Sequence, residues 1–393
     1  MITGISVRGF KSLSHFKLAG LTGFSCLVGL NGAGKSSVLQ FLDFAAHLMR
    51  GDVGPWLMKR GWGASDLHSK FRTKSNIVFA IGVRVSSGEK YIWGASFNRA
   101  TLACTTEQVT RASDSKIIFS LDKGRYTAGD DSPAKVGFIY AGSILSSLKQ
   151  EVLPPEVVEL KSHISNIRSL ELLSPHLMRS SLRDVANDIG VGGEKLSPFL
   201  YGIKGAERDA LLVLLRKFYP AVVDFKVRQE RAGWKKLFIV EEFNGVRVET
   251  ESKHVNDGLL RILAILAQSS RGDSLLLFDE IENGVNPEIV ELLVETLREV
   301  KQQVIVTTHS PMILNYLSDD VAKKSVHFVY RSFDGGTKAI PLFSVPKMAD
   351  KLKVMGPGEA FVDTNLTRLT KECADHDEAE AQESKESEGL GSV

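Results

Sequence analysis

Cysteine and long apolar runs are both scarce in this 393-residue chain. Its three cysteines, Cys26, Cys104 and Cys373, lie far apart and form no CxxC pair, which argues against a disulfide framework and against a zinc site. No run approaches the roughly 18 apolar residues that a membrane span needs, and the opening MITGISVRGFKSL lacks the apolar core of a signal peptide. We therefore expect a cytoplasmic protein in a reducing compartment, with no membrane partner.

Net charge is also small, at +2, but it is unevenly distributed. Residues 1–150 carry 19 Lys and Arg against 9 Asp and Glu, whereas residues 251–300 and the C-terminal end are acidic. A basic N-terminal half could bind nucleic acid through its phosphates, and it could equally be a solvated face without a ligand. Composition leaves both interpretations open, so nucleic acid stays a candidate partner.

The sequence does contain a glycine-rich turn between two regular elements. Residues 29–36, GLNGAGKS, fit the P-loop pattern G-x-x-x-x-G-K-[ST]. An apolar segment, FSCLV, precedes the turn as a predicted strand, and SSVLQFLDFAAHLMR follows it with helical spacing. Backbone N–H groups in such a loop, together with the helix N-terminus, bind phosphate, so this context favours a nucleotide site over a purely structural turn.

The nucleotide site is predicted residue by residue from this pattern. Lys35 would reach the β- and γ-phosphates, and the Ser36 hydroxyl would ligate Mg²⁺. No N-K-x-D segment that reads guanine is present, so we expect ATP and Mg²⁺ as the ligands. The residues expected around the nucleotide in this loop are Asn31, Gly32, Ala33, Gly34, Lys35, Ser36 and Ser37.

A second motif follows an apolar strand in the C-terminal half. Residues 275–278, LLLF, read as a buried parallel strand, and Asp279 and Glu280 come directly after it. Active groups gather at the carboxyl ends of such strands. Asp279 is predicted to hold the Mg²⁺ shell, and Glu280 to orient and deprotonate the attacking water. The alternative is an ordinary strand end with solvated carboxylates.

A strand–helix–strand unit continues from these carboxylates. The helix is predicted in NPEIVELLVETLREVKQQ, capped by Asn286 with Pro287 in its first turn. The next apolar strand, VIVTT, ends at His309, followed by Ser310 and Pro311. Because neighbouring parallel strands end at one edge of a sheet, we expect His309 at the same edge as the phosphates.

These motifs, in this order and spacing, resemble the ABC-type ATPases of the RecF/SMC/OLD group, particularly its stand-alone bacterial ATPases. ISVRGFKSL is similar to the family's first strand, SKHVNDGLLRILAIL to its signature helix, written around S-D-G-x-x-R, and VTTHSP to its switch-histidine segment. GGEKLSPFL and ADKLKVMGPGEAFVD also resemble segments of the group. The resemblance covers about residues 1–365.

The resemblance implies an α/β fold, a P-loop NTPase of the ABC-ATPase type with two lobes. Two subunits would hold two ATP molecules between them, each P-loop facing the signature helix of the other subunit. Asn256, Asp257 and Gly258 would then contact the γ-phosphate in trans, and His309 would sense it. Asn256 stands where serine is usual, which predicts altered geometry and slow turnover. The glutamine that completes the family's Mg²⁺ shell is not assignable here.

A simpler interpretation of the signature segment is an N-capped amphipathic helix with an apolar core stripe. The stripe would be Leu259, Ile262, Leu263 and Leu266.

The domain organisation is predicted as four segments. Residues 1–141 would form the N-terminal ATPase lobe, 142–220 a helical, lid-like insertion, and 221–372 the C-terminal lobe with signature, Walker B strand and switch histidine. The polar, acidic residues 373–393 are expected to be disordered. Sustained heptads are missing, which excludes the long coiled-coil arm of SMC proteins, and no Toprim nuclease fits after His309.

We therefore expect an ATP hydrolase with Glu280, Lys35 and His309 as catalytic residues. It would dimerise around ATP and drive or gate a separately encoded effector, in antiviral defence or DNA repair by family analogy. Three alternatives stay open: a nucleotide-gated scaffold with little turnover, a RecF-like DNA-binding loader, and a transporter motor subunit. The missing glutamine-rich signature and the large insertion weaken the last one.

Overall fold

The computed structural model describes residues 1–71 and 76–390, with side chains placed as far as residue 378. The chain divides into two compact units. Unit 1 comprises Met1–Ile167 and Ile305–Val393, and unit 2 comprises Arg168–Val304. The chain thus leaves unit 1 once and returns to it once.

This division differs from the boundaries expected from the sequence, because the segment 142–220 is shared between the two units. The first crossing lies inside a short strand, β10 (Ile167–Ser169), and the second inside β15 (Gln303–Thr307). Neither crossing is a Pro-, Gly- or Ser-rich linker, so composition carries no signal for it. Whether 142–220 acts as one functional insertion stays a prediction.

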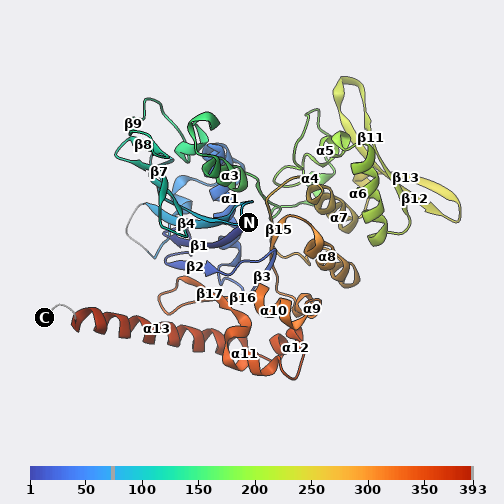
Figure 1. Cartoon of the computed structure of the whole chain (residues 1–393). Helices are drawn as coiled ribbons and strands as arrows, with labels where there is room; N and C mark the ends of the chain where they lie inside the picture. Colours follow the sequence, from blue (N-terminus) through green and yellow to red (C-terminus); the bar gives the residue numbers. More distant parts are fainter. Residues whose placement is uncertain (72–75, 391–393) are drawn as a thin grey trace. The chain divides into compact units, whose positions relative to one another are not determined.

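Unit 1 is built on an eight-stranded antiparallel sheet in the order β2-β1-β4-β5-β6-β7-β8-β9 (Figure 1). One face of this sheet packs on α1 (Lys35–Arg50), so alternate residues of β5 are buried. Aromatic rings make part of this contact: Phe44 lies 5.1 Å from Phe97 and Phe41 5.5 Å from Phe79 between centroids. Because α1 begins at the glycine-rich turn, this packing fixes the end of the turn relative to the eight-stranded sheet. The strands are β1 (Ile2–Arg8), β2 (Phe16–Ala19), β4 (Ile77–Arg84), β5 (Lys90–Asn98), β6 (Ala103–Arg111), β7 (Ile117–Asp122), β8 (Arg125–Ala128) and β9 (Ala134–Lys135).

A buried carboxyl, Glu107 on β6, ties this sheet to the segment that follows β9. Its Oε2 accepts from Trp93 Nε1 and from the Ser143 hydroxyl, and its Oε1 accepts from the Ile144 N–H at 2.6 Å. Loss of hydration raises the pKa of Glu107 to about 7, because the three donors that favour the carboxylate only partly offset burial.

Stability is therefore expected to fall as the pH rises from 5 to 8. The Glu107 pKa is about 7 in the fold against an ordinary value of 4.5, so the folded state binds more protons between these values. The contribution is fully present below the lower pKa, is lost as the pH rises through the upper one, and amounts to about 3 kcal/mol. Urea unfolding of the wild type and of Glu107→Gln at several pH values measures it. Equal pH slopes for the two proteins would contradict this assignment.

A second set of strands in unit 1 carries the glycine-rich turn. β3 (Phe24–Val28) is buried at every position and lies between β15 and β16 (Val326–Arg331), running parallel to β16. The stretch KKSVHFVYRSFDGGTKAIPLF, residues 323–343, predicts two strands joined by the DGG turn, and the antiparallel pairing of β16 with β17 (Thr337–Pro341) confirms this hairpin. The helices of unit 1 are α1, α2 (Val53–Lys59), α3 (Pro155–Ser165), α9 (Pro311–Asn315), α10 (Asp319–Ser325), α11 (Pro346–Lys351), α12 (Pro357–Val362) and α13 (Leu366–Leu390).

The structure forms a helix over the tail that the sequence predicts to be disordered. Figure 1 shows α13 as a long helix leading to the C-terminal end, and it continues to Leu390. Glu, Ala, Gln and Lys dominate this segment and are strong helix formers, which explains helix where no apolar periodicity exists. The first half of α13 contacts β16, because the Tyr330 hydroxyl donates to Asp377 Oδ2 at 2.8 Å. Among the described residues, no helix has the length and apolar character to cross a bilayer.

Unit 2 contains a three-stranded antiparallel sheet in the order β11-β12-β13. Apolar and polar residues alternate around one turn over residues 225–250, which predicts a hairpin of two strands. A second turn at Asn244 and Gly245, both with positive φ, adds a third strand. Residues 181–190, expected to be helical, form no helix, although the structure describes all of them. The elements are β10, α4 (Pro175–Met178), α5 (Leu196–Gly202), α6 (Gly205–Phe218), β11 (Val222–Gln229), β12 (Lys235–Phe243), β13 (Val246–Glu251), α7 (Asp257–Ser269), β14 (Leu275–Phe278) and α8 (Pro287–Glu299).

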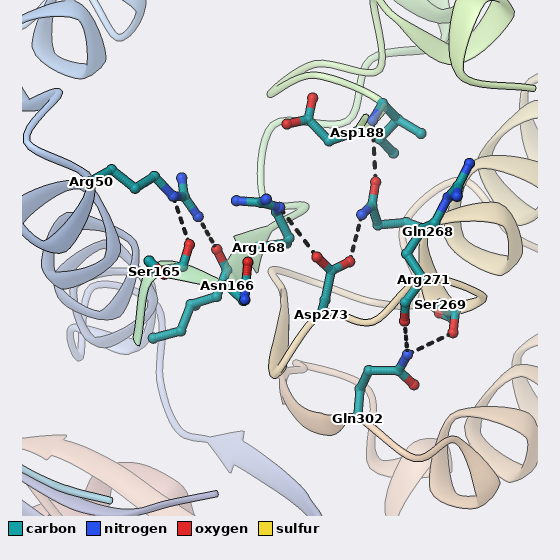
Figure 2. Close-up of polar contacts among 12 residues, drawn as sticks. Arg50, Ser165, Asn166, Arg168, Asp188, Gln268, Ser269, Arg271, Asp273 and Gln302 are labelled. Carbon is teal, nitrogen blue, oxygen red and sulfur yellow. Dashed lines mark hydrogen bonds and ion pairs between the residues drawn. The ribbon is translucent and has the colours of Figure 1, made fainter. Parts of the chain in front are cut away.

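Each unit holds its own side of the first crossing through polar contacts (Figure 2). In unit 1, Arg50 at the end of α1 donates to the Ser165 and Ile167 carbonyls. In unit 2, Arg168 pairs with Asp273 at 3.3 Å, and Gln268 Nε2 donates to the same carboxylate at 2.6 Å. The strand ends that flank the crossing are therefore each fixed within their own unit.

Candidate functional site

The glycine-rich turn, residues 29–36 (the P-loop), connects β3 to α1 as predicted. Gly29 has a φ of 150°, and a Cβ there would lie 2.0 Å from the Val329 carbonyl oxygen. Gly34 has a φ of 108°, and a Cβ there would lie 2.1 Å from Thr337 Oγ1. Both positions exclude a side chain, because the backbone favours glycine and the neighbouring strands approach too closely.

Lys35 is the first residue of α1 and is only 5% exposed. Its Nζ donates to the Gly29 oxygen at 2.9 Å and to the Leu30 oxygen at 3.2 Å, so the loop's own backbone holds the ammonium group beside the turn. The first turn of α1 has no acidic residue, and no side chain caps it. Its positive end is therefore not neutralised by a carboxylate in that turn, and a polyphosphate fits this donor set.

The other predicted P-loop residues lie where a ligand could reach them. Asn31 and Gly32 are exposed, Ser36 and Ser37 in the first turn of α1 are half-buried, and Ala33 is buried. A hydroxyl oxygen from Ser36 and a carboxylate from Asp279 are the hard oxygen donors that Mg²⁺ prefers. Their chemistry fits the predicted metal.

His309 lies at the same sheet edge as the P-loop, within unit 1. The Thr308 N–H donates to the Leu27 oxygen of β3 at 3.2 Å, which aligns the end of β15 with the strand that enters the P-loop. His309 is exposed, and the Ser310 N–H donates to Thr308 Oγ1 at 2.9 Å in the turn after it. The structure thus brings the two predicted phosphate-facing elements of unit 1 together.

Unit 2 carries the two predicted carboxylates at the end of β14, whose four residues are all buried. Asp279 is half-buried and Glu280 is exposed. Glu280 has a φ of 47°, a left-handed conformation that is uncommon for any residue other than glycine. Such strain collects at functional positions, and here it accompanies a tight turn in which the Asn283 N–H donates to the Glu280 oxygen at 2.9 Å.

The predicted signature segment starts α7. Asn256 is the N-cap, and its Oδ1 accepts from the Leu259 N–H at 2.7 Å. The capped amphipathic helix is therefore present, and its predicted stripe of Leu259, Ile262, Leu263 and Leu266 is buried. The phosphate-binding role remains a prediction alongside it, since Asn256 and Asp257 are both exposed and the amide nitrogen of Asn256 is still a possible donor.

Within unit 2, the start of α7 packs against the loop that follows β14. A Cβ at Gly258 would lie 3.3 Å from the Gly284 oxygen and 3.1 Å from the Tyr219 hydroxyl, whose pKa burial raises to about 12. Arg261 Nη2 donates to the Glu280 oxygen at 3.4 Å. Signature segment and carboxylate loop are thus neighbours in one unit, while the P-loop and His309 belong to the other.

Arg179 is a residue of this region that the sequence motifs do not single out. Its Nη2 donates to Asp257 Oδ1 at 2.6 Å and to the Val255 oxygen at 2.7 Å, so it fixes the loop that enters α7. Arg261, by contrast, is the arginine of the S-D-G-x-x-R pattern, so the sequence did carry a signal for it.

Loss of the Asn256 cap is expected to destabilise the protein measurably. Asn256→Ala removes the acceptor for the Leu259 N–H and should cost about 1 kcal/mol of unfolding free energy. Asn256→Ser keeps a capping oxygen and should retain most of it. Urea unfolding of the three proteins checks this. An alanine variant as stable as the wild type would show that the cap contributes nothing.

Comparisons with known proteins bear on the fold and on the family. Among solved structures, the chain is similar to the SMC head bound to the C-winged helix domain of ScpA, with TM-score 0.51, 16% identity and coverage of 86% of this chain and 96% of that one. An SMC head with an extended coiled coil bound to the C-terminal domain of ScpA, derived from Pyrococcus furiosus, has a TM-score of 0.48 and 13% identity. The match covers 90% of this chain and 99% of that one. The SMC head from Thermotoga maritima has a TM-score of 0.45 and 11% identity, and the match covers 86% of this chain and 98% of that one.

The first of these structures shows the fold, which is that of a P-loop NTPase of the ABC-ATPase type. The search of curated proteins finds no match. A family model described as "AAA domain, putative AbiEii toxin, Type IV TA system" matches residues 24–315, from β3 to the end of α9. The chain belongs to this AAA-domain family.

Proposed function

We propose that the protein binds ATP with Mg²⁺, hydrolyses it, and dimerises around it. The observation that carries the proposal is the P-loop, where the ammonium of Lys35, two glycines that admit no side chain and the start of α1 meet in one turn. No carboxylate in that first turn competes with an anion. A polyphosphate is the ligand that this arrangement suits best.

Each predicted residue then has a role in hydrolysis. Lys35 binds the β- and γ-phosphates, and Ser36 and Asp279 would hold Mg²⁺, which when bound supplies charge neutralisation for the phosphates. Glu280 orients the attacking water and takes its proton, and its exposure leaves the carboxylate accessible to water. His309, at the sheet edge of the P-loop, donates to the γ-phosphate and so distinguishes ATP from ADP.

The exposed start of the signature segment supports the proposed dimer. Asn256, Asp257 and Gly258 form the start of α7 in unit 2, and Asn256 and Asp257 are exposed. The Leu259 N–H is used by the Asn256 cap, and Arg179 pairs with the Asp257 carboxylate in that first turn. The other N–H groups at the helix start would face the γ-phosphate of an ATP bound by a second subunit. ATP would bind the closed dimer more tightly than the open one, and hydrolysis would release it.

A separately encoded effector is the proposed output of this cycle. Two of the similar SMC head structures are described as bound to domains of ScpA, so heads of this fold can carry a protein partner. By family analogy we place the protein in antiviral defence or DNA repair, as the sensing and ATP-hydrolysing part of such a system.

ATP turnover and mass of the purified protein, with and without ATP and Mg²⁺, test the proposal. We expect phosphate release that depends on Mg²⁺ and a mass that doubles when ATP is added. Absence of ATP binding would overturn the proposal, and ATP binding without any change in mass would overturn the dimer.

A nucleotide-gated scaffold is the second candidate, and Asn256 favours it. Its side-chain oxygen is used in the cap, where the family usually has serine, so its contact with phosphate in trans would differ. Asn256→Ser should then increase turnover while preserving dimerisation. Turnover that is unchanged by this substitution would remove the support that Asn256 gives to the scaffold.

A DNA-binding loader is the third candidate. Arg8, His15, Lys17 and Lys338 line one hollow of about 410 Å³ in unit 1, formed by β1, β2 and β17, although Asp377 also lines it. Binding of the purified protein to duplex DNA should weaken steeply as salt rises if these cations contact phosphates. No binding at low salt would exclude a loader that acts on DNA directly.

A further inference from the structure

The β16–β17 hairpin contacts the P-loop through two side chains that no motif singles out. Arg331, the last residue of β16, donates from Nε to the Gly32 oxygen at 2.8 Å. Thr337, the first residue of β17, lies 2.8 Å from the Ala33 oxygen through its hydroxyl. One hairpin therefore holds two consecutive carbonyls of the loop.

Arg331 is itself held in place. Its Nη1 donates to the Gly335 oxygen in the hairpin turn at 2.7 Å, and its guanidinium carbon lies 6.0 Å from the centre of the Phe71 ring. A planar guanidinium fixed by one carbonyl of the hairpin and one of the P-loop has little freedom to swing away. The contact with Gly32 is thus pre-formed, at low cost in side-chain entropy.

Thr337 is fully buried, and its hydroxyl lies 2.8 Å from both the Ala33 oxygen and Ser12 Oγ. A hydroxyl has one proton, and the Ala33 carbonyl can only accept, so we assign the Thr337 proton to that carbonyl. Ser12 then donates to Thr337, and the Ser12 carbonyl in turn accepts the Thr337 N–H at 2.9 Å. The hydrogen bonds to Ala33 and Ser12 therefore fix the orientation of the Thr337 hydroxyl.

These two contacts set the direction of two peptide planes. In a planar trans peptide the C=O and the N–H point in opposite directions. With the Gly32 oxygen on Arg331, the Ala33 N–H reaches the Leu30 oxygen at 3.2 Å and closes the turn. With the Ala33 oxygen on Thr337, the Gly34 N–H is directed away from the hairpin.

We propose that Arg331 and Thr337 are positioning residues that hold the P-loop in its phosphate-binding form before nucleotide arrives. The inference rests on the proposed ATP binding. A loop that is already ordered loses less entropy when it binds, so both residues raise affinity for phosphates that the loop contacts, in ADP as well as in ATP. They act through the P-loop backbone and not on the reacting water, so they should alter KM far more than kcat.

Titration with a fluorescent ATP analogue tests this on the full-length protein. Arg331→Gln and Thr337→Val should each bind about tenfold more weakly, the loss expected for one well-placed hydrogen bond. Thr337→Ser keeps the hydroxyl and should bind within about twofold of the wild type. Lys324→Gln is the matched control, because Lys324 is an exposed lysine in the last turn of α10, directly before the same hairpin, and its affinity should be unchanged.

Two further readouts separate positioning from general damage. In steady-state hydrolysis Arg331→Gln should raise KM about tenfold with kcat within about twofold, whereas misfolding would reduce kcat with the active fraction. Thermal unfolding without nucleotide should differ little between Arg331→Gln and the wild type. If Thr337→Val fails to fold, the Arg331→Gln variant, at a half-buried position, still tests the positioning role.

The outcomes distinguish this inference from the proposed function beneath it. If the wild type binds nucleotide, Lys35→Ala does not, and Arg331→Gln and Thr337→Val bind as the wild type does, the positioning role is overturned while ATP binding stands. If Lys324→Gln weakens binding as much as Arg331→Gln, the effect is one of overall charge and the inference is equally overturned. If the wild type does not bind, the proposed function fails first and this inference with it.

Discussion

A Glu280→Gln variant is expected to bind ATP as the wild type does and to hydrolyse it about 10²–10⁴-fold more slowly, the usual contribution of a general base. Glutamine has nearly the size of glutamate and keeps a carbonyl that can accept a hydrogen bond from water, but it cannot take the proton. Because the side chain at position 280 is exposed, the substitution should change the unfolding free energy by no more than about 0.5 kcal/mol.

The variant should also accumulate as an ATP-bound dimer, because hydrolysis is the proposed step that opens it. Phosphate release measures the chemical step, and light scattering with and without ATP and Mg²⁺ measures the mass. Glu291→Gln is the matched control: Glu291 is an exposed glutamate on α8, so the change removes the same charge from the same unit. It should hydrolyse ATP at the wild-type rate and should not be trapped.

The results that contradict this prediction point to different alternatives. Wild-type hydrolysis by Glu280→Gln would show that another group takes the proton. ATP binding and dimerisation without turnover in both proteins would support the gated scaffold. Slow hydrolysis by the variant with no change in mass would support Glu280 as the general base and contradict the ATP-dependent dimer. The protein would then be a hydrolase whose signature segment does not act in trans.

The local structure around each candidate motif was predictable because each motif is encoded in one short stretch. The turn at 29–36 joins an all-apolar strand to an amphipathic helix, and local rules suffice to recognise strand, turn and helix. Asp279 follows four buried residues in the same way. The stripe predicted on α7 is buried because its spacing of three and four residues puts one helix face into the core.

What the sequence could not provide are contacts between distant segments. Arg331 and the Gly32 oxygen are 299 residues apart, and Thr337 and the Ala33 oxygen are 304 apart, so neither pair leaves a local pattern. Arg179 contacts Asp257 from 78 residues away. A single Arg or Thr at the end of a strand carries no signal until the fold places it.

The third strand of the β11-β12-β13 sheet was not predicted, although the sequence carries a signal for it. Asn244 and Gly245 form the dipeptide that most strongly indicates a hairpin, and strands flank it on both sides, so a third strand could have been inferred. The division into units left no such trace, because both crossings lie within strands and not in flexible linkers.

Lys35→Ala is expected to lose at least about 100-fold in ATP affinity, because charge-assisted hydrogen bonds to phosphate contribute about 1.5–3 kcal/mol each. The same substitution should not lower the stability of the nucleotide-free protein by much. Lys35 is 5% exposed, and its ammonium is held by carbonyl oxygens of the loop, so the folded state bears the cost of burying a charge. Removing that charge offsets the cavity that alanine leaves.

Thermal unfolding with and without ATP and Mg²⁺ separates these two effects. The wild type should gain about 2.7 kcal/mol at an ATP concentration 100 times its Kd, and Lys35→Ala should gain nothing measurable. Lys35→Met fills the same space without the charge and should behave as Lys35→Ala does toward ATP, with higher stability. Lys59→Ala, on the exposed end of α2, is the control that should retain the full gain.

A stabilisation by ATP that survives in Lys35→Met would mean that the nucleotide binds without the P-loop lysine, and the assignment of residues 29–36 would be wrong. The opposite failure is equally informative. If both Lys35 variants are much less stable than the wild type without ATP, the ammonium is holding the loop together through Gly29 and Leu30. Lost binding would then follow from a disordered loop, and only a variant that keeps a cation, Lys35→Arg, could tell phosphate contact from loop support.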